Sequence, residues 1–188
     1  QGSTKRTPAS SFRAQRRGGK GIKGAAADED DPVEHLFVTS THDYLLFFTN
    51  RGRTYRLRAH EIPMKERTAR GNALVNLLPL EADERVQAII DTRTYEDGVF
   101  LFFVTKNGIV KKTKMSEYDS ALRSGLIAIN LQRGDELVKV IQTSGDNEII
   151  MVSKNGMSIR FSENDVRSMG RATAGVRGMK LKNAEDAV

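Results

Sequence analysis

The sequence predicts an all-β fold built from repeated blades, and three observations lead to this prediction. A template recurs four times in the 188 residues, starting at Gly2, Gly52, Gly108 and Gly156. Each of these first glycines is followed four residues later by a cation, as in "GSTKRT", "GRTYRL", "GIVKKT" and "GMSIRF". Short apolar runs flank the glycines, whereas sustained helical periodicity is scarce. Repeats of about 50 residues with about four short strands each are typical of propeller-like blades.

Each later repeat is expected to contain a β-hairpin centred on its first glycine. The stretches "DYLLFFTNRGRTYRL", "GVFLFFVTKNGIVKKT" and "EIIMVSKNGMSIRF" place two apolar runs around a turn. In two of them an Asn-Gly pair supplies the positive φ angles that tight hairpins require, at Asn107-Gly108 and Asn155-Gly156. Because a single hairpin cannot bury its face, we expect the blades to pack on their neighbours in a ring or crescent of sheets.

A second glycine follows the first in every repeat, at Gly21, Gly71, Gly125 and Gly175. The opening residues obey this template, which counts against an organellar transit peptide as the explanation of their basic, acid-free composition. The chain does not begin with Met, so we expect it to be a piece of a longer protein. We expect one domain, with repeats at approximately residues 1–48, 49–104, 105–152 and 153–188.

Charge follows the repeat. The net charge is +6, and residues 1–24 carry seven Lys/Arg and no Asp/Glu. Lys and Arg also exceed Asp and Glu in residues 51–70, 106–123 and 154–177, and the segments between them are acidic. A solvated surface explains any one of these runs. Since equivalent positions of packed repeats point the same way, we expect one continuous basic band, which suits a phosphate backbone; anionic lipid is the second choice.

Composition narrows the partner and excludes several site types. No apolar run reaches the length of a membrane helix, and the absence of Cys excludes disulfides and thiolate metal sites. Aromatic content is 6% without Trp, which argues against stacking of single strands and favours double-stranded DNA bound through its backbone. We predict no catalytic or metal site, because the histidines lack metal-ligand spacing and the tyrosines fit strand or core positions. These residues are His35, His42, His60, Tyr44, Tyr55, Tyr95 and Tyr118.

The most basic stretch is "QRRGGKG", Gln15–Gly21, which we call the box. Its glycines lack side chains, so their N–H groups can approach a phosphate closely. Arg16 and Arg17 can grip phosphate bidentately, and Lys20 adds a point charge. A flexible basic linker is the alternative explanation. The spacing is not that of a nucleotide-binding P-loop.

The box, together with "STHDYLLFFTNRGRTYRL", "RTARGNALVNLLPLEADERV", "NGIVKKT" and "MGRATAGVRGMKL", closely resembles the family of C-terminal DNA-wrapping domains of bacterial DNA gyrase A. The resemblance covers essentially the whole chain. The box is specific, because the related topoisomerase IV protein has a degenerate version or none. The resemblance implies a β-pinwheel of four-stranded blades that exchange strands with their neighbours. Six blades are usual in the family, and this sequence supplies about three and a half.

The resemblance also implies a function. DNA would wrap around the basic perimeter with positive writhe and present a second segment for ATP-driven strand passage and negative supercoiling. The catalytic tyrosine and the ATPase would lie outside this segment, which would itself need no cofactor, while the parent complex, a type IIA DNA topoisomerase, uses ATP and Mg²⁺. Partners would be double-stranded DNA, the N-terminal part of gyrase A, and gyrase B, in a cytoplasmic heterotetramer with no membrane. The alternatives are a topoisomerase IV C-terminal domain and a propeller-like module that binds acidic proteins.

Two sets of DNA-binding residues are predicted. The box clamps one end of the duplex through Gln15, Arg16, Arg17, Gly18, Gly19, Lys20 and Gly21. The rim set guides the duplex and comprises Lys5, Arg6, Arg51, Arg53, Arg56, Arg58, Arg67, Arg70, Lys106, Lys111, Lys112, Lys114, Lys154, Arg160 and Arg171.

Overall fold

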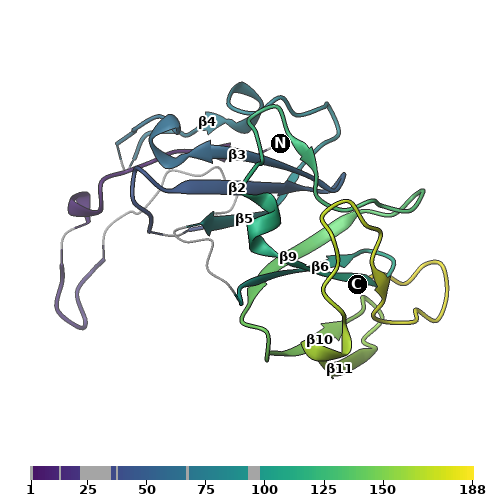
Figure 1. Cartoon of the computed structure of the whole chain (residues 1–188). Helices are drawn as coiled ribbons and strands as arrows, with labels where there is room; N and C mark the ends of the chain where they lie inside the picture. Colours follow the sequence, from purple (N-terminus) through teal and green to yellow (C-terminus); the bar gives the residue numbers. More distant parts are fainter. Residues whose placement is uncertain (1, 13, 22–34, 37, 67, 93–97) are drawn as a thin grey trace.

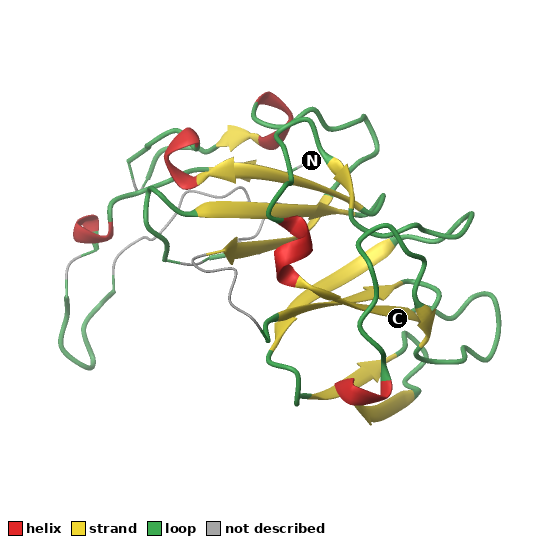
Figure 2. Cartoon of the chain, viewed as in Figure 1, coloured by secondary structure: helices red, strands yellow, loops and turns green. Residues whose placement is uncertain are grey.

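The computed structural model describes residues 2–12, 14–21, 35–36, 38–66, 68–92 and 98–188, which form β-strands and short 3₁₀ turns (Figures 1 and 2). The strands are β1 (Ser3–Thr4), β2 (Tyr44–Thr49), β3 (Arg53–Arg58), β4 (Asn72–Ala73), β5 (Val86–Thr92), β6 (Phe100–Thr105), β7 (Ile109–Lys114), β8 (Leu126–Ile127), β9 (Leu137–Thr143), β10 (Glu148–Val152), β11 (Ser158–Ser162) and β12 (Val176–Arg177). The 3₁₀ turns are η1 (Ala9–Ser11), η2 (Ala59–Glu61), η3 (Leu74–Asn76), η4 (Met115–Tyr118) and η5 (Glu163–Asp165). These ranges contain no α-helix, so the predicted all-β fold is confirmed. They also contain no helix with the length and apolar character needed to cross a membrane.

The strands form blades that follow one another along the chain (Figure 1). Blade 1 is the pair β1-β4, blade 2 is β5-β2-β3-β8, blade 3 is β12-β7-β6-β9, and blade 4 is the hairpin β10-β11. The two complete sheets have the predicted four strands. In blades 1 to 3 one strand is supplied by the next repeat, since β4 pairs with β1, β8 with β3 and β12 with β7, all antiparallel. Neighbouring repeats therefore exchange strands, as the resemblance implied.

The first glycines of the last three repeats each close a hairpin, as predicted. The N–H of each glycine donates to the carbonyl three residues earlier, at 2.9–3.0 Å. Gly52, Gly108 and Gly156 have φ angles of 72°, 84° and 82°. No described residue other than glycine has a positive φ, so the expectation that Asn107 and Asn155 share this conformation is wrong. In each turn only the final glycine is left-handed. The residue before the glycine needs no positive φ, so this position can hold a residue other than Asn, such as Arg51.

Alternation along the strands places apolar side chains on both faces of blades 2, 3 and 4. Between blades 2 and 3 the buried side chains include Leu46, Phe48, Leu101 and Phe103. Between blades 3 and 4 they include Phe102, Val104, Ile149 and Met151. From blade 2 to blade 4, one face of a blade thus packs on the opposite face of the next. The continuous apolar runs in the sequence reflect this burial on two sides, because a sheet with one wet face would show alternating polar residues.

Blade 4 has one covered face and one open face. Ile150 and Val152 hold the positions that Leu46 and Phe48 hold in blade 2, yet they are 67% and 55% exposed. The equivalent side chains of blade 2 are fully buried against blade 3. The described part of the chain therefore leaves an apolar sheet face without a cover.

The second glycines lie where one repeat crosses over the preceding blade. A Cβ on Gly125 would lie 2.6 Å from the ring of Tyr55, and one on Gly175 would meet the carbonyl oxygen of Val110. Gly71 lies against blade 1 in the same way. We call the stretch from the end of the 3₁₀ turn to the second glycine the crossing segment of a repeat. The crossing segments are residues 12–21, 62–71, 119–125 and 166–175, and the first of them contains the box.

The blades are offset from the predicted repeat boundaries. The boundaries at 48/49 and 104/105 fall inside β2 and β6, and the boundary at 152/153 falls at the end of β10. Each hairpin is therefore shared between two predicted repeats, and blade 2 takes strands from three of them.

Candidate nucleic-acid interface

The box is an exposed loop that projects beyond β1 and η1 on one side of the molecule (Figure 1). All seven of its residues are exposed. The side-chain oxygen Oε1 of Gln15 accepts a hydrogen bond from the N–H of Gly21 at 2.9 Å, which joins the two ends of the loop. Gly18 and Gly21 are left-handed, with φ angles of 85° and 72°. The loop is thus closed by Gln15, and its cations lie on the outside.

Two of the glycine amides of the box are already engaged. The N–H of Gly19 donates to the carbonyl of Arg16 at 3.0 Å, and the N–H of Gly21 donates to Gln15. The expectation that these amides are open to a phosphate is therefore wrong for both. A Cβ on Gly19 would lie 2.7 Å from Oε1 of Gln15, so glycine at this position makes room for the tie. The exposed side chains of Arg16, Arg17 and Lys20 remain available to an anion.

Several predicted rim cations are exposed, and they fall into two groups. The exposed members are Arg51, Arg58, Arg70, Lys106, Lys114, Lys154 and Arg160. Lys106 and Lys154 lie in hairpin turns, whereas Arg58 and Lys114 lie at the opposite ends of β3 and β7. A strand of this length spans about 17–20 Å, so these two pairs of cations lie well apart along the strand direction. The arrow of β3, the strand that ends at Arg58, points toward the side from which the box projects (Figure 1).

Some exposed cations have partners within their own blade. Arg51 pairs with Glu81 at 2.5 Å and with Asp83, and this hydrogen bond holds the pKa of Asp83 below its usual range. Arg58 donates from Nε and Nη2 to the hydroxyl of Tyr44, at 3.1 and 2.7 Å. Such surface contacts are weak, because both partners remain solvated. These arginines can therefore exchange their partners for a phosphate at small cost.

Other predicted rim residues are not on the surface. Lys111 and Lys112 are 0% and 5% exposed, so their assignment to the DNA-contacting rim is wrong. Alternation sends these neighbours to opposite faces of β7, and both faces of blade 3 are packed against other blades. The half-buried members are Lys5, Arg6, Arg53, Arg56 and Arg171. Arg67 lies outside the described residues.

Lys111 is held by two carbonyl groups. Its Nζ donates to the carbonyl oxygen of Ala128 at 2.6 Å and to that of Arg171. Burial lowers the pKa of Lys111 to about 7, a shift that nearby Glu117 opposes and Arg171 reinforces. This lysine does not face solvent, and it ties the crossing segment that contains Arg171 to the strand region around Ala128.

The repeat template did not reveal a third group of exposed cations. Its members are Arg85, Arg123, Arg133, Lys139, Arg167, Arg177, Lys180 and Lys182. Arg85 and Arg123 pair with Glu136 and Glu61, at 3.9 and 3.4 Å. Most of the others sit in segments that the sequence marks as acidic or weakly charged. Only Lys139 and Arg177 lie in strands, and the other six lie in loops and turns whose exposure composition does not report.

The described residues contain no group of His, Asp and Glu arranged to hold a metal ion. The tyrosines have structural roles, as predicted for Tyr44, Tyr55 and Tyr118; Tyr95 lies outside the described residues. The hydroxyl of Tyr55 donates to Glu84 at 3.1 Å, and burial beside this carboxylate raises the pKa of Tyr55 to about 12. The buried Tyr118 donates to the carbonyl of Ala128 at 2.9 Å.

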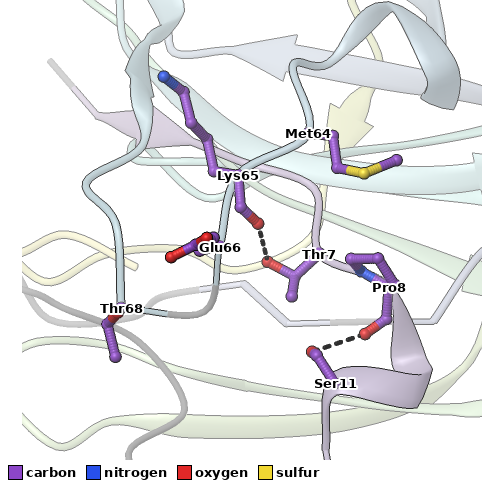
Figure 3. A pocket seen from close by; sticks show the side chains of 7 residues that line it. All are labelled: Thr7, Pro8, Ser11, Met64, Lys65, Glu66 and Thr68. Atoms are coloured by element: carbon purple, nitrogen blue, oxygen red, sulfur yellow. Dashed lines mark hydrogen bonds between the residues drawn. The ribbon is translucent and has the colours of Figure 1, made fainter.

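A groove lies near the foot of the box, between the residues after β1 and the second crossing segment (Figure 3). Its lining residues are Thr7, Pro8, Ser11, Met64, Lys65, Glu66 and Thr68. The hydroxyl of Thr7 donates to the carbonyl of Lys65 at 3.1 Å, and that of Ser11 donates to the carbonyl of Pro8 at 2.7 Å. Both hydroxyls are thus engaged within the chain, and the Thr7 bond ties the residues after β1 to the second crossing segment.

Comparison with known families matches the chain to "DNA gyrase C-terminal domain, beta-propeller" over residues 1–40, 43–93, 100–144 and 147–188. DNA gyrase A of Mycolicibacterium smegmatis is 49% identical over 187 residues, which are 98% of this chain and 22% of the relative. DNA gyrase A of Halalkalibacterium halodurans is 49% identical over 178 residues, 95% of this chain and 21% of the relative. The chain thus spans less than a quarter of the length of these relatives.

Two solved structures share the fold. The C-terminal domain of DNA topoisomerase IV superposes with a TM-score of 0.86 at 34% identity, covering 99% of this chain and 56% of that one. The DNA gyrase A C-terminal domain superposes with a TM-score of 0.66 at 25% identity, covering 97% of this chain and 58% of that one.

Proposed function

Because the chain belongs to the family of DNA gyrase C-terminal β-propeller domains, we propose that it binds duplex DNA through the phosphates and bends it along its surface. The observation that carries this proposal is the box, a closed and fully exposed loop with three outward cations. The resemblance implies that this motif distinguishes gyrase from topoisomerase IV, and the two curated relatives described above are gyrase proteins. The box therefore favours gyrase over topoisomerase IV.

Bending needs many contacts. Smooth bending of 20–30 base pairs by 40–90° costs on the order of 1–6 kcal/mol, which no single surface ion pair offsets. We propose that Arg16, Arg17 and Lys20 clamp one end of the duplex. Arg58, Lys114 and the other exposed rim cations then supply the further contacts, with release of condensed counterions.

The module contributes binding and no chemistry. In this proposal the strand passage, the ATPase and their Mg²⁺ belong to the rest of gyrase A and to gyrase B, in a cytoplasmic complex. The chain itself needs no cofactor. Bent DNA held by the module would present a second segment for passage.

A topological assay tests the proposal. Nicked circular DNA is incubated with increasing amounts of the chain, sealed with ligase and freed of protein, and its topoisomers are resolved. A wrapping module shifts the linking number in proportion to the amount bound, with positive writhe. A protein-interaction module shifts nothing, and that outcome would overturn the proposal.

The box is tested with the triple substitution Arg16→Ala, Arg17→Ala and Lys20→Ala. We expect a smaller linking-number shift. The slope of log binding constant against log salt concentration should also become shallower, by about 0.9 for each phosphate that the variant no longer neutralises. The matched control removes three exposed cations outside the box, Arg133, Lys180 and Lys182. Equal losses in the two triple variants would show that net charge, and not the box, determines binding.

A further inference from the structure

We infer that one cation in each of the first three repeats is a joint between blades and not a contact to DNA. The position is the fourth residue after the first glycine, which is the cation that defines the repeat in the sequence. We call Arg6, Arg56 and Lys112 the joint cations. In each case the side chain donates to a carbonyl at the 3₁₀ turn of the next blade.

The first joint links blade 1 to the turn η2 of blade 2. The guanidinium of Arg6 donates from Nε to the carbonyl of Ile62 at 3.0 Å and from Nη2 to that of His60 at 3.4 Å. The main chain adds two bonds, since Arg6 N–H donates to Pro63 and Arg6 O accepts from Lys65, at 3.2 and 2.9 Å. The side chain and the backbone of Arg6 therefore both form hydrogen bonds to the second crossing segment.

The second joint links blade 2 to blade 3 in the same way. Nη1 of Arg56 donates to the carbonyl of Asp119, the C-cap residue that follows η4. The N–H of Arg56 donates to the carbonyl of Leu122 at 3.3 Å. The guanidinium also lies 4.2 Å from the ring centroid of Tyr44, so its blade holds it in place.

The third joint links blade 3 to blade 4 and is buried. Nζ of Lys112 donates to the carbonyl of Glu163 in η5 at 3.3 Å and lies 4.0 Å from the carboxylate of Glu163. It lies 4.7 Å from the ring centroid of Phe100, the equivalent of Tyr44. The carbonyl of Lys112 accepts from the N–H of Met169 at 2.8 Å. The chemistry of the first two joints recurs here with a lysine.

Arg160 holds the same position in blade 4 and has a different partner. It donates from Nε to Glu148 within its own hairpin, at 3.0 Å, and both side chains are well exposed. Glu148 replaces the aromatic residue found at this place in blades 2 and 3. The carbonyl contact is thus seen where the described chain supplies a following turn, which ties the cation's role to the neighbouring blade.

The position suits a joint for a physical reason. Arg56 pairs across the hairpin with Leu46, and Lys112 pairs with Phe102, so each cation shares the face that packs on the next blade. A carbonyl that ends a short helical turn lacks an intrahelical partner, and a cation satisfies it with a charge-assisted bond. Since the donor is fixed to one blade and the acceptor to the next, these bonds fix the angle between blades.

This inference extends to DNA only through the proposed function. If DNA follows the blades, the angle at each joint sets the curvature of its path, although the joint cation never touches a phosphate. The joint cations are then positioning residues for wrapping. Their loss should change how far DNA bends without changing how many counterions are released.

Hydrogen exchange tests the joint without DNA. In the whole chain, Arg56→Met should raise the exchange rates of the amides of residues 56 and 128 by about tenfold, the effect of losing one charge-assisted bond. These amides donate across the joint, to Leu122 and Gly52. Arg56→Lys should restore slow exchange, because Lys112 makes the same contact. Arg58→Met is the matched control, since Arg58 stacks on the same tyrosine.

The inference would be overturned if the amides of residues 56 and 128 exchanged equally fast in Arg56→Met and wild type. It would also be overturned if Arg58→Met raised their exchange rates as much as Arg56→Met does. Should Arg56→Met fail to fold, Arg6→Met repeats the test at the first joint. The amide of Lys65 is then the reporter, because it donates to the carbonyl of residue 6 at 2.9 Å.

The topological assay tests the effect on DNA. Arg56→Met should reduce the linking-number shift per bound chain and leave the salt dependence of binding unchanged, whereas Arg58→Met should make the salt dependence shallower. A shallower salt dependence in Arg56→Met would show that Arg56 contacts phosphate and would overturn the inference. If wild type shifts no linking number, the proposed function fails, while the exchange result still decides whether the joint exists.

Discussion

The crossing segment that ends at Gly175 and the one that contains the box follow the same template in opposite surroundings. Arg171 and Arg17 both precede the second glycine by four residues. Arg171 donates through Nη1 to the carbonyl of Ile127, and its N–H donates to Glu117. Arg17 is exposed. A Cβ on Gly175 would meet the preceding blade, whereas one on Gly21 would meet no atom within 4 Å.

The difference shows that the neighbour, and not the template, decides what a basic crossing segment does. Where a preceding blade lies beneath it, the segment uses its donors and its glycine for packing. Where the described chain places none beneath it, the same template presents its cations to solvent. In the proposed function, the contact to DNA therefore lies on the crossing segment that has no packing partner among the described residues.

We expect the largest change in stability when the second glycines are replaced by alanine. In Gly125→Ala a methyl group would enter the ring of Tyr55 at a φ angle of 92°, whereas Gly21→Ala has a φ of 72° and open space. We expect Gly125→Ala to lower the free energy of unfolding by about 2–5 kcal/mol, from backbone strain and overpacking together. Gly21→Ala should lose no more than the strain, about 1–2 kcal/mol. Urea unfolding measures both, and equal losses would contradict the packing role.

A buried lysine contacts a packed crossing segment and should make the stability of the chain depend on pH. Lys111 donates to the carbonyl of Arg171 and has a folded-state pKa of about 7, well below that of an unfolded lysine. Between these two values the unfolded chain binds more protons, so stability should rise with pH from about 7 upward, by at most about 1.4 kcal/mol per pH unit. Urea unfolding at several pH values from neutral upward measures this slope.

The control for the lysine experiment lies on the same strand. Lys111→Met should abolish the rise, and Lys114→Met, at an exposed position three residues on, should retain it. Parallel pH curves for wild type and Lys111→Met would mean that Lys111 stays charged when folded, which would contradict the burial argument.

The sequence predicted the fold better than the site, for a reason visible in β7. The apolar runs and the glycine turns are local signals, and they indicated the hairpins and the blades correctly. Whether a cation faces solvent depends on the neighbouring blade, which no local pattern reports. "KKT" at Lys111 therefore looked like a basic surface, although blade 3 is covered on both faces.

Periodicity misled in a related way. A cation that recurs in every repeat serves whatever recurs with it, and in the described residues that is the contact between one blade and the next. The box does not recur, since its equivalents lack the same three cations. The non-repeating departure from the template marks the candidate site, whereas the repeating part marks the architecture.

The smallest expected effect concerns the tie that gives the box its shape. Gln15→Ala removes the acceptor for the Gly21 amide, while Gln15→Glu keeps an oxygen at the same reach. Stability should change by less than about 0.5 kcal/mol in both, because the bond lies on the surface. The Gly21 amide should exchange faster in Gln15→Ala and as slowly as wild type in Gln15→Glu, as measured by NMR.

The DNA affinities of Gln15→Ala and Gln15→Glu show how much the loop shape and the loop charge each contribute to binding. Gln15→Ala loses only the closed shape of the loop, so its affinity should fall by up to about fivefold, the equivalent of one weak hydrogen bond. Gln15→Glu keeps the shape and adds a negative charge beside Arg16 and Arg17, so its loss should shrink as salt screens that charge. A salt-independent loss in Gln15→Glu would mean that the amide group of Gln15 itself contacts DNA. In that case the box would read the duplex through a residue that no packed crossing segment needs.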